Sequence, residues 1–169
     1  MIIENYVGID VSKLTIDVFI RENHVHKRFK NELNGFCQLA QWLQKQVCHS
    51  LESVLICFEH TGLYSLPLAL YLEKEGIPFA MLSALEIKKS MGITRGKNDI
   101  IDSKRIAEFA YRFKDKISAT VLPALDIRKV QSLLMLRNRL VSNMKGFVVS
   151  MNETLRTISM EDFPELFSA

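Results

Sequence analysis

The chain has 169 residues, of which 48% are hydrophobic and 24% charged, and its formal net charge is +3. These values are typical of a soluble globular protein with one main domain, and the small net charge by itself indicates no partner. No apolar run approaches the roughly 18 residues of a membrane span, and acidic Glu4 stands where a signal peptide carries basic residues. We therefore expect a cytoplasmic protein without a membrane partner. Three cysteines without a C-x-x-C spacing fit buried thiols in a reducing compartment.

Three short segments at the start of the chain alternate between apolar and polar residues. They are residues 6–13, 14–20 and 24–30, and this alternation predicts three β-strands. Because only short turns connect them, we expect the strands to be antiparallel neighbours. His24 and His26, on one face of the third strand, are expected to be exposed to solvent rather than to bind metal.

Asp10 is a carboxylate near the end of the otherwise apolar first strand, on the same face as Gly8. Burial of a carboxylate costs free energy unless a cation or a good hydrogen-bond donor meets it. Two explanations are open: Ser12 and Lys13, just past the turn, satisfy Asp10, or Asp10 holds a metal ion. Asp17 on the second strand is a further metal candidate, although pairing with an Arg or Lys on the sheet face is favoured.

The next part of the chain alternates between helix and strand. Asn34 is expected to cap the N-terminus of a helix. Residues 53–58 are a continuous apolar run, as in a strand buried on both faces, and this run ends at Glu59. A helix over residues 64–75 and a strand over residues 77–82 follow. This strand-helix-strand order predicts parallel pairing with a right-handed crossover.

The second half of the chain is predicted to be helical. Short helices over residues 84–91 and 99–113 flank a basic loop, and a long helix spans roughly residues 126–158. Its apolar residues recur at steps of three and four, which is typical of a coiled-coil arm. They are Leu133, Leu136, Leu140, Met144, Phe147, Met151, Leu155 and Ile158. We expect an α/β domain over residues 1–120, with helices on both faces of a mixed sheet. An arm over residues 121–169 is expected to join copies of the chain into a homodimer or larger homo-oligomer.

Four carboxylates stand out by their positions. Asp10 and Glu59 end two strands that are expected to be parallel neighbours, and ligands gather at such strand ends. Asp99 and Asp102, spaced i, i+3 at a helix start, share one face, although acids in a first turn also complement the helix dipole. Four converging carboxylates repel one another unless cations neutralise them. Such oxygen clusters suit Mg²⁺ or Mn²⁺, and two ions ~4 Å apart promote phosphodiester cleavage.

Three stretches in this order and spacing carry a resemblance to a known family. They are residues 7–13 (VGIDVSK), 58–64 (FEHTGLY) and 96–107 (GKNDIIDSKRIA). They resemble the DEDD transposases of bacterial insertion sequences, the insertion sequence 110 family, which are related to pilin-gene invertases. The resemblance covers residues 7–110 and implies a RuvC-like (ribonuclease H-like) domain.

The resemblance also implies a site and an activity. Asp10, Glu59, Asp99 and Asp102 take the four places of a tetrad that binds divalent metal. The activity is DNA transposition or site-specific recombination, guided in several members by an RNA that the element encodes. Family members continue into a second domain with a serine used in strand exchange, whereas this sequence stops at Ala169. A non-catalytic module that binds guide RNA or DNA and dimerises is therefore the alternative function.

Cations surround the carboxylates in the sequence. Residues 88–116 hold nine Lys or Arg against four Asp or Glu, and such flanking cations would bind a phosphate backbone independently of its sequence. A nucleotide-binding protein of the actin and sugar-kinase type also begins with a Gly-Ile-Asp strand, but no second glycine-rich phosphate turn follows here. The expected nucleic-acid contacts are Lys13, Arg95, Lys97, Lys104, Arg105, Arg137 and Arg139.

Overall fold

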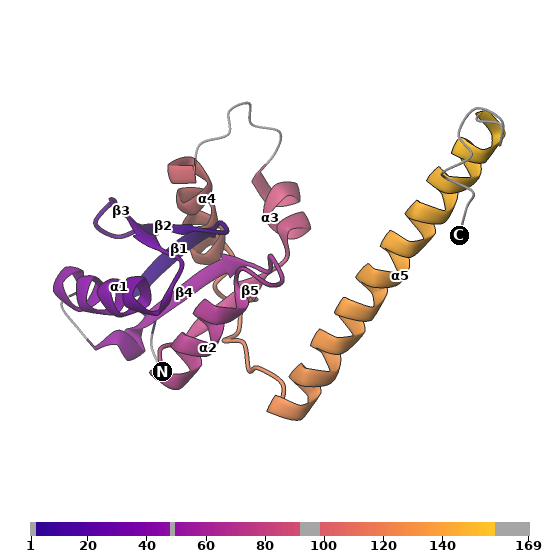
Figure 1. Ribbon diagram of the computed structural model, residues 1–169. Coiled ribbons are helices and arrows are strands. Elements are labelled where there is room, and N and C mark those ends of the chain that lie inside the picture. Colours follow the sequence, from indigo (N-terminus) through magenta and orange to yellow (C-terminus); the bar gives the residue numbers. More distant parts are fainter. Residues whose placement is uncertain (1–2, 48–49, 92–98, 158–169) are drawn as a thin grey trace. The chain divides into compact units, whose positions relative to one another are not determined.

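Five strands form one mixed sheet in the order β3-β2-β1-β4-β5 (Figure 1). The antiparallel pairs are β1–β2 and β2–β3, and β4 runs parallel to both β1 and β5. This topology confirms the predicted α/β class and the predicted strand pairing. The strands span Asn5–Val11 (β1), Thr15–Ile20 (β2), Val25–Lys30 (β3), Val54–Glu59 (β4) and Phe79–Leu82 (β5).

The computed structural model describes residues 3–47, 50–91 and 99–157. The chain divides into two compact units, Met1–Val121 and Leu122–Ala169. Within these described ranges, the first unit contains the sheet, four α-helices and a 3₁₀ turn, and the second contains one long α-helix.

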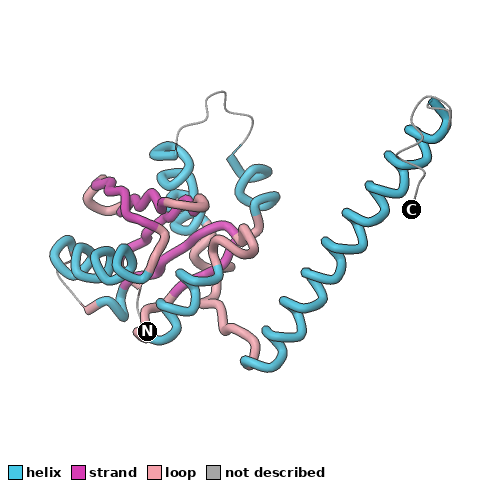
Figure 2. The backbone as a smooth tube through the Cα atoms, in the orientation of Figure 1, coloured by secondary structure: helices cyan, strands magenta, loops and turns pink. Residues whose placement is uncertain are grey.

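Helices cover both faces of the sheet in the first unit, as the magenta strands between cyan helices in Figure 2 show. One face carries α1 and α2, which contact each other through the rings of Phe36 and Tyr71, 5.6 Å apart between centroids. The opposite face carries α3 and α4, which share a buried apolar cluster with β1, β4 and β5. These helices span Leu33–Gln46 (α1), Leu66–Lys74 (α2), Ala84–Met91 (α3) and Asp99–Arg112 (α4), with a short 3₁₀ turn at Leu51–Ser53.

The prediction that Asn34 caps α1 is wrong. The N-cap is Glu32, two residues earlier, and it makes no side-chain cap hydrogen bond. The entry into α1 is set by a close backbone approach, since a Cβ at Gly35 would collide with the Lys30 carbonyl oxygen. The capping signal at Asn34 is therefore overridden by the tight passage from β3 into the helix.

The long helix α5 spans Leu125–Thr157, close to the predicted residues 126–158. None of its residues is buried, and every member of the predicted apolar stripe from Leu133 to Leu155 is exposed; Ile158 lies outside the described residues. No described helix is long and apolar enough to cross a membrane.

Candidate active site

Asp10 and Glu59 lie side by side at the carboxyl ends of β1 and β4. The last paired residues of these parallel strands are Ile9 and Phe58, so the next position along each strand brings Asp10 beside Glu59. Residues in register on neighbouring strands point to the same face, one strand spacing of about 4.8 Å apart. Both side chains are half-buried. The topology thus brings together two carboxylates that are 49 positions apart in the sequence.

The helix α4 lies on this same face of the sheet, where Gly8 provides room for it. A Cβ at Gly8 would collide with the Ser103 carbonyl oxygen and the Ala107 backbone nitrogen. Further along α4, the Tyr111 ring packs edge-on against Tyr6 with 5.5 Å between centroids. The helix therefore runs antiparallel to β1, and its first turn lies toward the strand end that carries Asp10.

Asp102 belongs to that first turn of α4. Its carboxylate accepts a hydrogen bond from Arg105 Nη1 at 2.9 Å and is 37% exposed. Asp99 begins the same helix, but its side chain lies outside the described part. Among the side chains that the structure does describe, no three His, Cys, Asp or Glu residues gather closely enough to share a metal ion.

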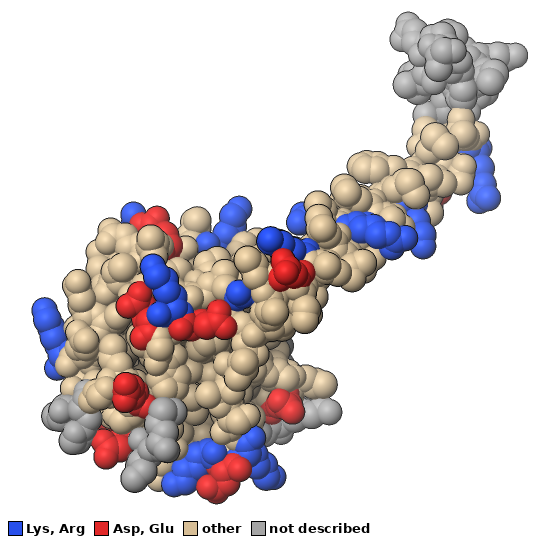
Figure 3. Space-filling view, turned by 90° about the horizontal axis from the view of Figure 1, so that it is seen from below, with Lys and Arg blue, Asp and Glu red and all other residues tan. Residues whose placement is uncertain are grey.

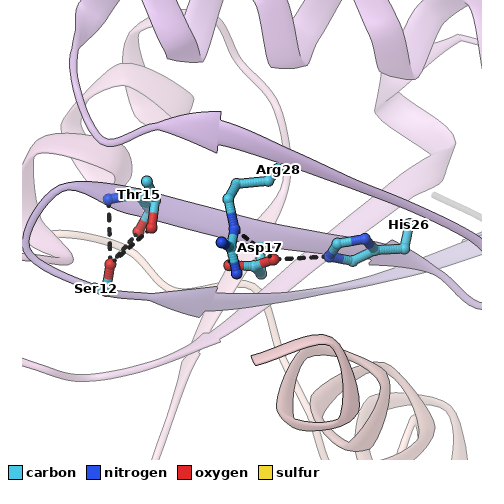
Figure 4. Close-up of polar contacts among 5 residues, drawn as sticks. All are labelled: Ser12, Thr15, Asp17, His26 and Arg28. Atoms are coloured by element: carbon cyan, nitrogen blue, oxygen red, sulfur yellow. Dashed lines mark hydrogen bonds and ion pairs between the residues drawn. The ribbon is translucent and has the colours of Figure 1, made fainter. Parts of the chain in front are cut away.

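Ser12 does not satisfy Asp10, which was one of the two explanations open from the sequence. The Ser12 hydroxyl donates to the Thr15 carbonyl oxygen at 2.8 Å and accepts from the Thr15 backbone N–H at 3.1 Å. Its single proton is thus engaged within the β1–β2 turn (Figure 4). Lys13 in the same turn is exposed.

A third carboxylate, Asp17, lies in register opposite Asp10 on β2. It is only 2% exposed. Arg28 Nε donates to both of its oxygens, at 2.9 and 3.1 Å, and His26 Nε2 lies 2.8 Å from Oδ1 (Figure 4). The predicted pairing of Asp17 with a basic residue is confirmed. The expectation that His26 is exposed to solvent is wrong, because its ring is half-buried and contacts the buried Asp17 carboxylate. His24 is exposed, as expected.

One buried thiol also lies on the face of Asp10 and Glu59. Cys57 is fully buried, and this burial raises the pKa of its thiol to about 12. The thiol is therefore protonated at neutral pH and serves as an apolar core group beneath the carboxylates rather than as a nucleophile.

The sequence matches the family model of the DEDD transposases of the IS110 type, described as a transposase, over residues 7–160. The chain belongs to the IS110 family of DEDD transposases. No curated protein matches it. Membership confirms the resemblance predicted from the three motifs and the RuvC-like α/β fold, and it assigns the chain to DNA transposition, with DNA as the substrate. DEDD transposases in general depend on divalent metal.

The donor set of this IS110-family chain fits a hard divalent cation in its chemistry. Asp10 and Glu59 supply carboxylate oxygens from adjacent positions on one sheet face, and oxygen donors are what Mg²⁺ and Mn²⁺ prefer. Two carboxylates one strand spacing apart repel each other, and a divalent cation bound beside them would relieve this repulsion.

The predicted nucleic-acid contacts fall into three groups. Lys13 and Lys104 are exposed in the first unit, with Lys104 Nζ 5.7 Å from the centre of the Phe19 ring. Arg105 is half-buried against Asp102, so a phosphate contact would compete with this ion pair. Arg137 and Arg139 are exposed on α5, where blue basic side chains outnumber red acidic ones (Figure 3). Arg95 and Lys97 lie outside the described residues.

Arg28 is the residue of this site that the sequence analysis missed. It pairs with Asp17 across two strands and so lies on the site face, yet in the sequence it is one of several cations in residues 24–30. Period-two alternation in the sequence does place Arg28 on the same strand face as His26 and Lys30. Its position opposite Asp17, however, follows only from the register of β2 and β3.

Proposed function

We propose that this chain is the metal-dependent catalytic part of a DNA transposase or site-specific recombinase. In this proposal Asp10, Glu59, Asp99 and Asp102 hold Mg²⁺ or Mn²⁺. The observation that supports it is the in-register position of Asp10 and Glu59 on the sheet face where α4 packs over Gly8 at Ser103 and Ala107. Asp10 and Glu59 thus stand at one end of the sheet, Asp102 lies in the first turn of the helix that packs on the same face, and Asp99 begins that helix.

Bound metal would supply the charge that activates a nucleophile and stabilises a leaving oxygen in phosphodiester cleavage. The chain's own residues hold and orient it: Asp10 and Glu59 are fixed by the buried strands from which they project, and Asp102 is carried on a docked helix. Arg105 neutralises Asp102 in the arrangement described here. Lys13, Lys104 and Arg105, with Arg95, Lys97, Arg137 and Arg139, are proposed to contact nucleic-acid phosphates. We also propose that the protein is cytoplasmic and that a guide RNA directs this activity.

The ion pair between Asp102 and Arg105 favours a second candidate function. A carboxylate already neutralised by a cation has less need of metal, so the chain could serve as a non-catalytic module that binds guide RNA or DNA. A nuclease assay of the 169-residue chain with Mn²⁺ and labelled duplex or single-stranded DNA separates the two. Mn²⁺-dependent cutting that chelation abolishes supports the enzyme, whereas stable binding without cutting under all metal conditions supports the module.

We further propose that α5 joins copies of the chain. Its stripe repeats with steps of three, four and four residues, so that Leu133, Met144 and Leu155 occupy equivalent positions. This is an eleven-residue repeat, which keeps one face toward a partner helix with only slight right-handed supercoiling. Val130, Leu134 and Val148 add exposed apolar surface beside the stripe, which suits a homodimer or a bundle of more helices.

Replacing Leu140 by Glu is expected to abolish this association. Leu140 lies mid-stripe and is 59% exposed in the single chain, so a charge there would be buried without a partner in an oligomer. Light scattering should give a multiple of the 19.4 kDa chain mass for the unmodified chain and the mass of one chain for the Leu140→Glu variant. Ser142→Glu, on the opposite side of α5, is the matched control and should still associate. Equal masses for the two variants would contradict the proposal.

A further inference from the structure

Three loops carry exposed apolar side chains at the end of the sheet where the candidate active site lies. Leu14 lies in the turn between β1 and β2, Leu33 is the first residue of α1, and Leu63 and Tyr64 lie between β4 and α2. Their exposed fractions are 74%, 68%, 62% and 45%, in that order. These four residues form the apolar rim. Exposed apolar side chains that gather in one place, unlike scattered ones, mark a binding surface.

Asn31 holds the three loops together. Its backbone N–H donates to the Leu14 carbonyl oxygen at 2.9 Å. Its side-chain amide donates to the carbonyl oxygens of Ser12 at 2.8 Å and Tyr64 at 3.0 Å, and Asn31 stands two residues before Leu33. Because these hydrogen bonds end on main-chain oxygens, they fix the loops without engaging the side chains of the apolar rim.

The apolar rim lies close to the two carboxylates at the strand ends. Leu14 follows Asp10 by four residues, and Leu63 follows Glu59 by four. Four residues of extended chain span at most about 14 Å, which limits both Cα separations. Successive nucleotides rise about 3.4 Å along a B-form strand. The rim is therefore no more than about four nucleotides from a phosphate bound at the carboxylates.

The charge of the loops suits a polyanion. The turn between β1 and β2 and the loop between β4 and α2 contain Lys13 and His60, and neither holds an Asp or Glu. Both of these side chains are exposed. A surface of this composition attracts a phosphate backbone. Single-stranded DNA combines such a backbone with apolar base faces, so it complements both the charge of the loops and the rim.

Unpaired bases are the part of DNA that an apolar surface can contact. In a duplex the bases are stacked on one another and present only their edges to the grooves. An unpaired base offers its face to aromatic and apolar side chains. Tyr64 is the aromatic member of the rim, and its 45% exposure leaves part of the ring open to stacking. Leucine side chains can insert beside such a base as apolar wedges.

We propose that the apolar rim binds unpaired bases of the DNA strand on which Asp10 and Glu59 act, with Tyr64 stacking on one of them. This inference deepens the proposed function and rests on it for the position of the scissile phosphate. It names the substrate class: DNA that is unpaired within about four nucleotides of that phosphate.

The test measures affinity for a single-stranded DNA oligonucleotide and for a fully paired duplex by fluorescence anisotropy, with EDTA present so that no cleavage occurs. Tyr64→Ala should weaken single-strand binding about tenfold, within the range for one lost base stack. It should leave duplex affinity and the salt slope unchanged, because no phosphate contact is lost. Tyr64→Phe keeps the ring and should bind the single strand as the unmodified chain does.

Leu70→Ala is the matched control, because Leu70 is an exposed leucine that lies within α2 and outside the rim. It should bind both DNAs as the unmodified chain does. Leu14→Ser should weaken single-strand binding about threefold, as expected for partial burial of one leucine, and it decides the question if Tyr64→Ala does not fold. Equal single-strand affinities for the rim variants and the control would overturn the proposal.

Two other outcomes would also overturn it. One is a loss of affinity in Tyr64→Ala that is equal for the single strand and the duplex, since base faces are open only in the former. The other is an unchanged single-strand affinity with a lower mass of Tyr64→Ala in light scattering. The apolar rim would then be a contact between copies of the chain.

The outcome is separable from that of the proposed function. If Asp10→Asn retains full cleavage while Tyr64→Ala loses single-strand affinity, the metal assignment fails and the base-binding role of the rim stands. If Asp10→Asn loses cleavage and Tyr64→Ala matches Leu70→Ala in single-strand affinity, the catalytic proposal stands and the role of the rim fails.

Discussion

Asp10→Asn is expected to reduce metal-dependent DNA cleavage or recombination on the order of 10³-fold. The change replaces the carboxylate by an amide of nearly the same shape and removes the negative charge with which Asp10 is proposed to bind the metal ion beside Glu59. Metal stabilisation of phosphodiester cleavage amounts to several kcal/mol, and each 1.4 kcal/mol corresponds to a factor of ten in rate. The measurement is the single-turnover cleavage rate with Mg²⁺ and with Mn²⁺.

A matched control separates this effect from a loss of fold. Glu52→Gln neutralises an exposed acid just before β4 and should leave the cleavage rate unchanged. The circular dichroism spectrum of Asp10→Asn should equal that of the unmodified chain, and its affinity for Mn²⁺ should fall. Full cleavage by a folded Asp10→Asn chain would refute the catalytic role proposed for Asp10, and with it the proposed metal-dependent mechanism.

Gly8→Ala is expected to lower the free energy of unfolding of the first unit by about 3 kcal/mol, the upper part of the range for overpacked cores. The new Cβ collides with the backbone of α4 at Ser103 and Ala107, and backbone atoms cannot move aside as a flexible side chain can. Urea unfolding followed by circular dichroism gives the change. Because α4 carries Asp102, DNA cleavage should fall even under conditions where the variant remains folded.

Gly146→Ala is the control for this second prediction. A Cβ at Gly146 meets nothing within 4 Å, and alanine is favoured over glycine inside a helix by about 0.5–1 kcal/mol. This variant should leave the stability of the sheet unit unchanged. If Gly8→Ala unfolds at the same urea concentration as the unmodified chain, the tight docking of α4 on β1 is refuted.

Local patterns in the sequence were enough to predict the elements of the sheet unit. The period-two alternation of residues 14–20 and 24–30 and the continuous apolar run of residues 53–58 each match an observed strand. These patterns are reliable because they express which face of a strand is buried. The start of α1 was misplaced, because its position depends on how closely Gly35 approaches Lys30, and that contact is not a local propensity.

The candidate site was predicted only in part. That Asp10 and Glu59 would be neighbours followed from two parallel strands ending in carboxylates, and the register bears out their neighbouring positions. Arg28 escaped notice because its importance comes from Asp17, and Asp17 acquires Arg28 as a partner only when β2 and β3 pair in a particular register. The metal-binding roles of the four acids remain predictions.

The sequence by itself determined the α/β class, the family and the acids that end the strands, because hydrophobic periodicity and short motifs are properties of neighbouring residues. Only the tertiary structure decided which side chains face one another. Strand register placed Asp17 and Arg28 in line with Asp10. Because glycine has no Cβ, Gly8 allows α4 to pack closely against the sheet. Both are contacts between segments far apart in the chain, where the free energy depends on mutual fit and not on the preference of either segment alone.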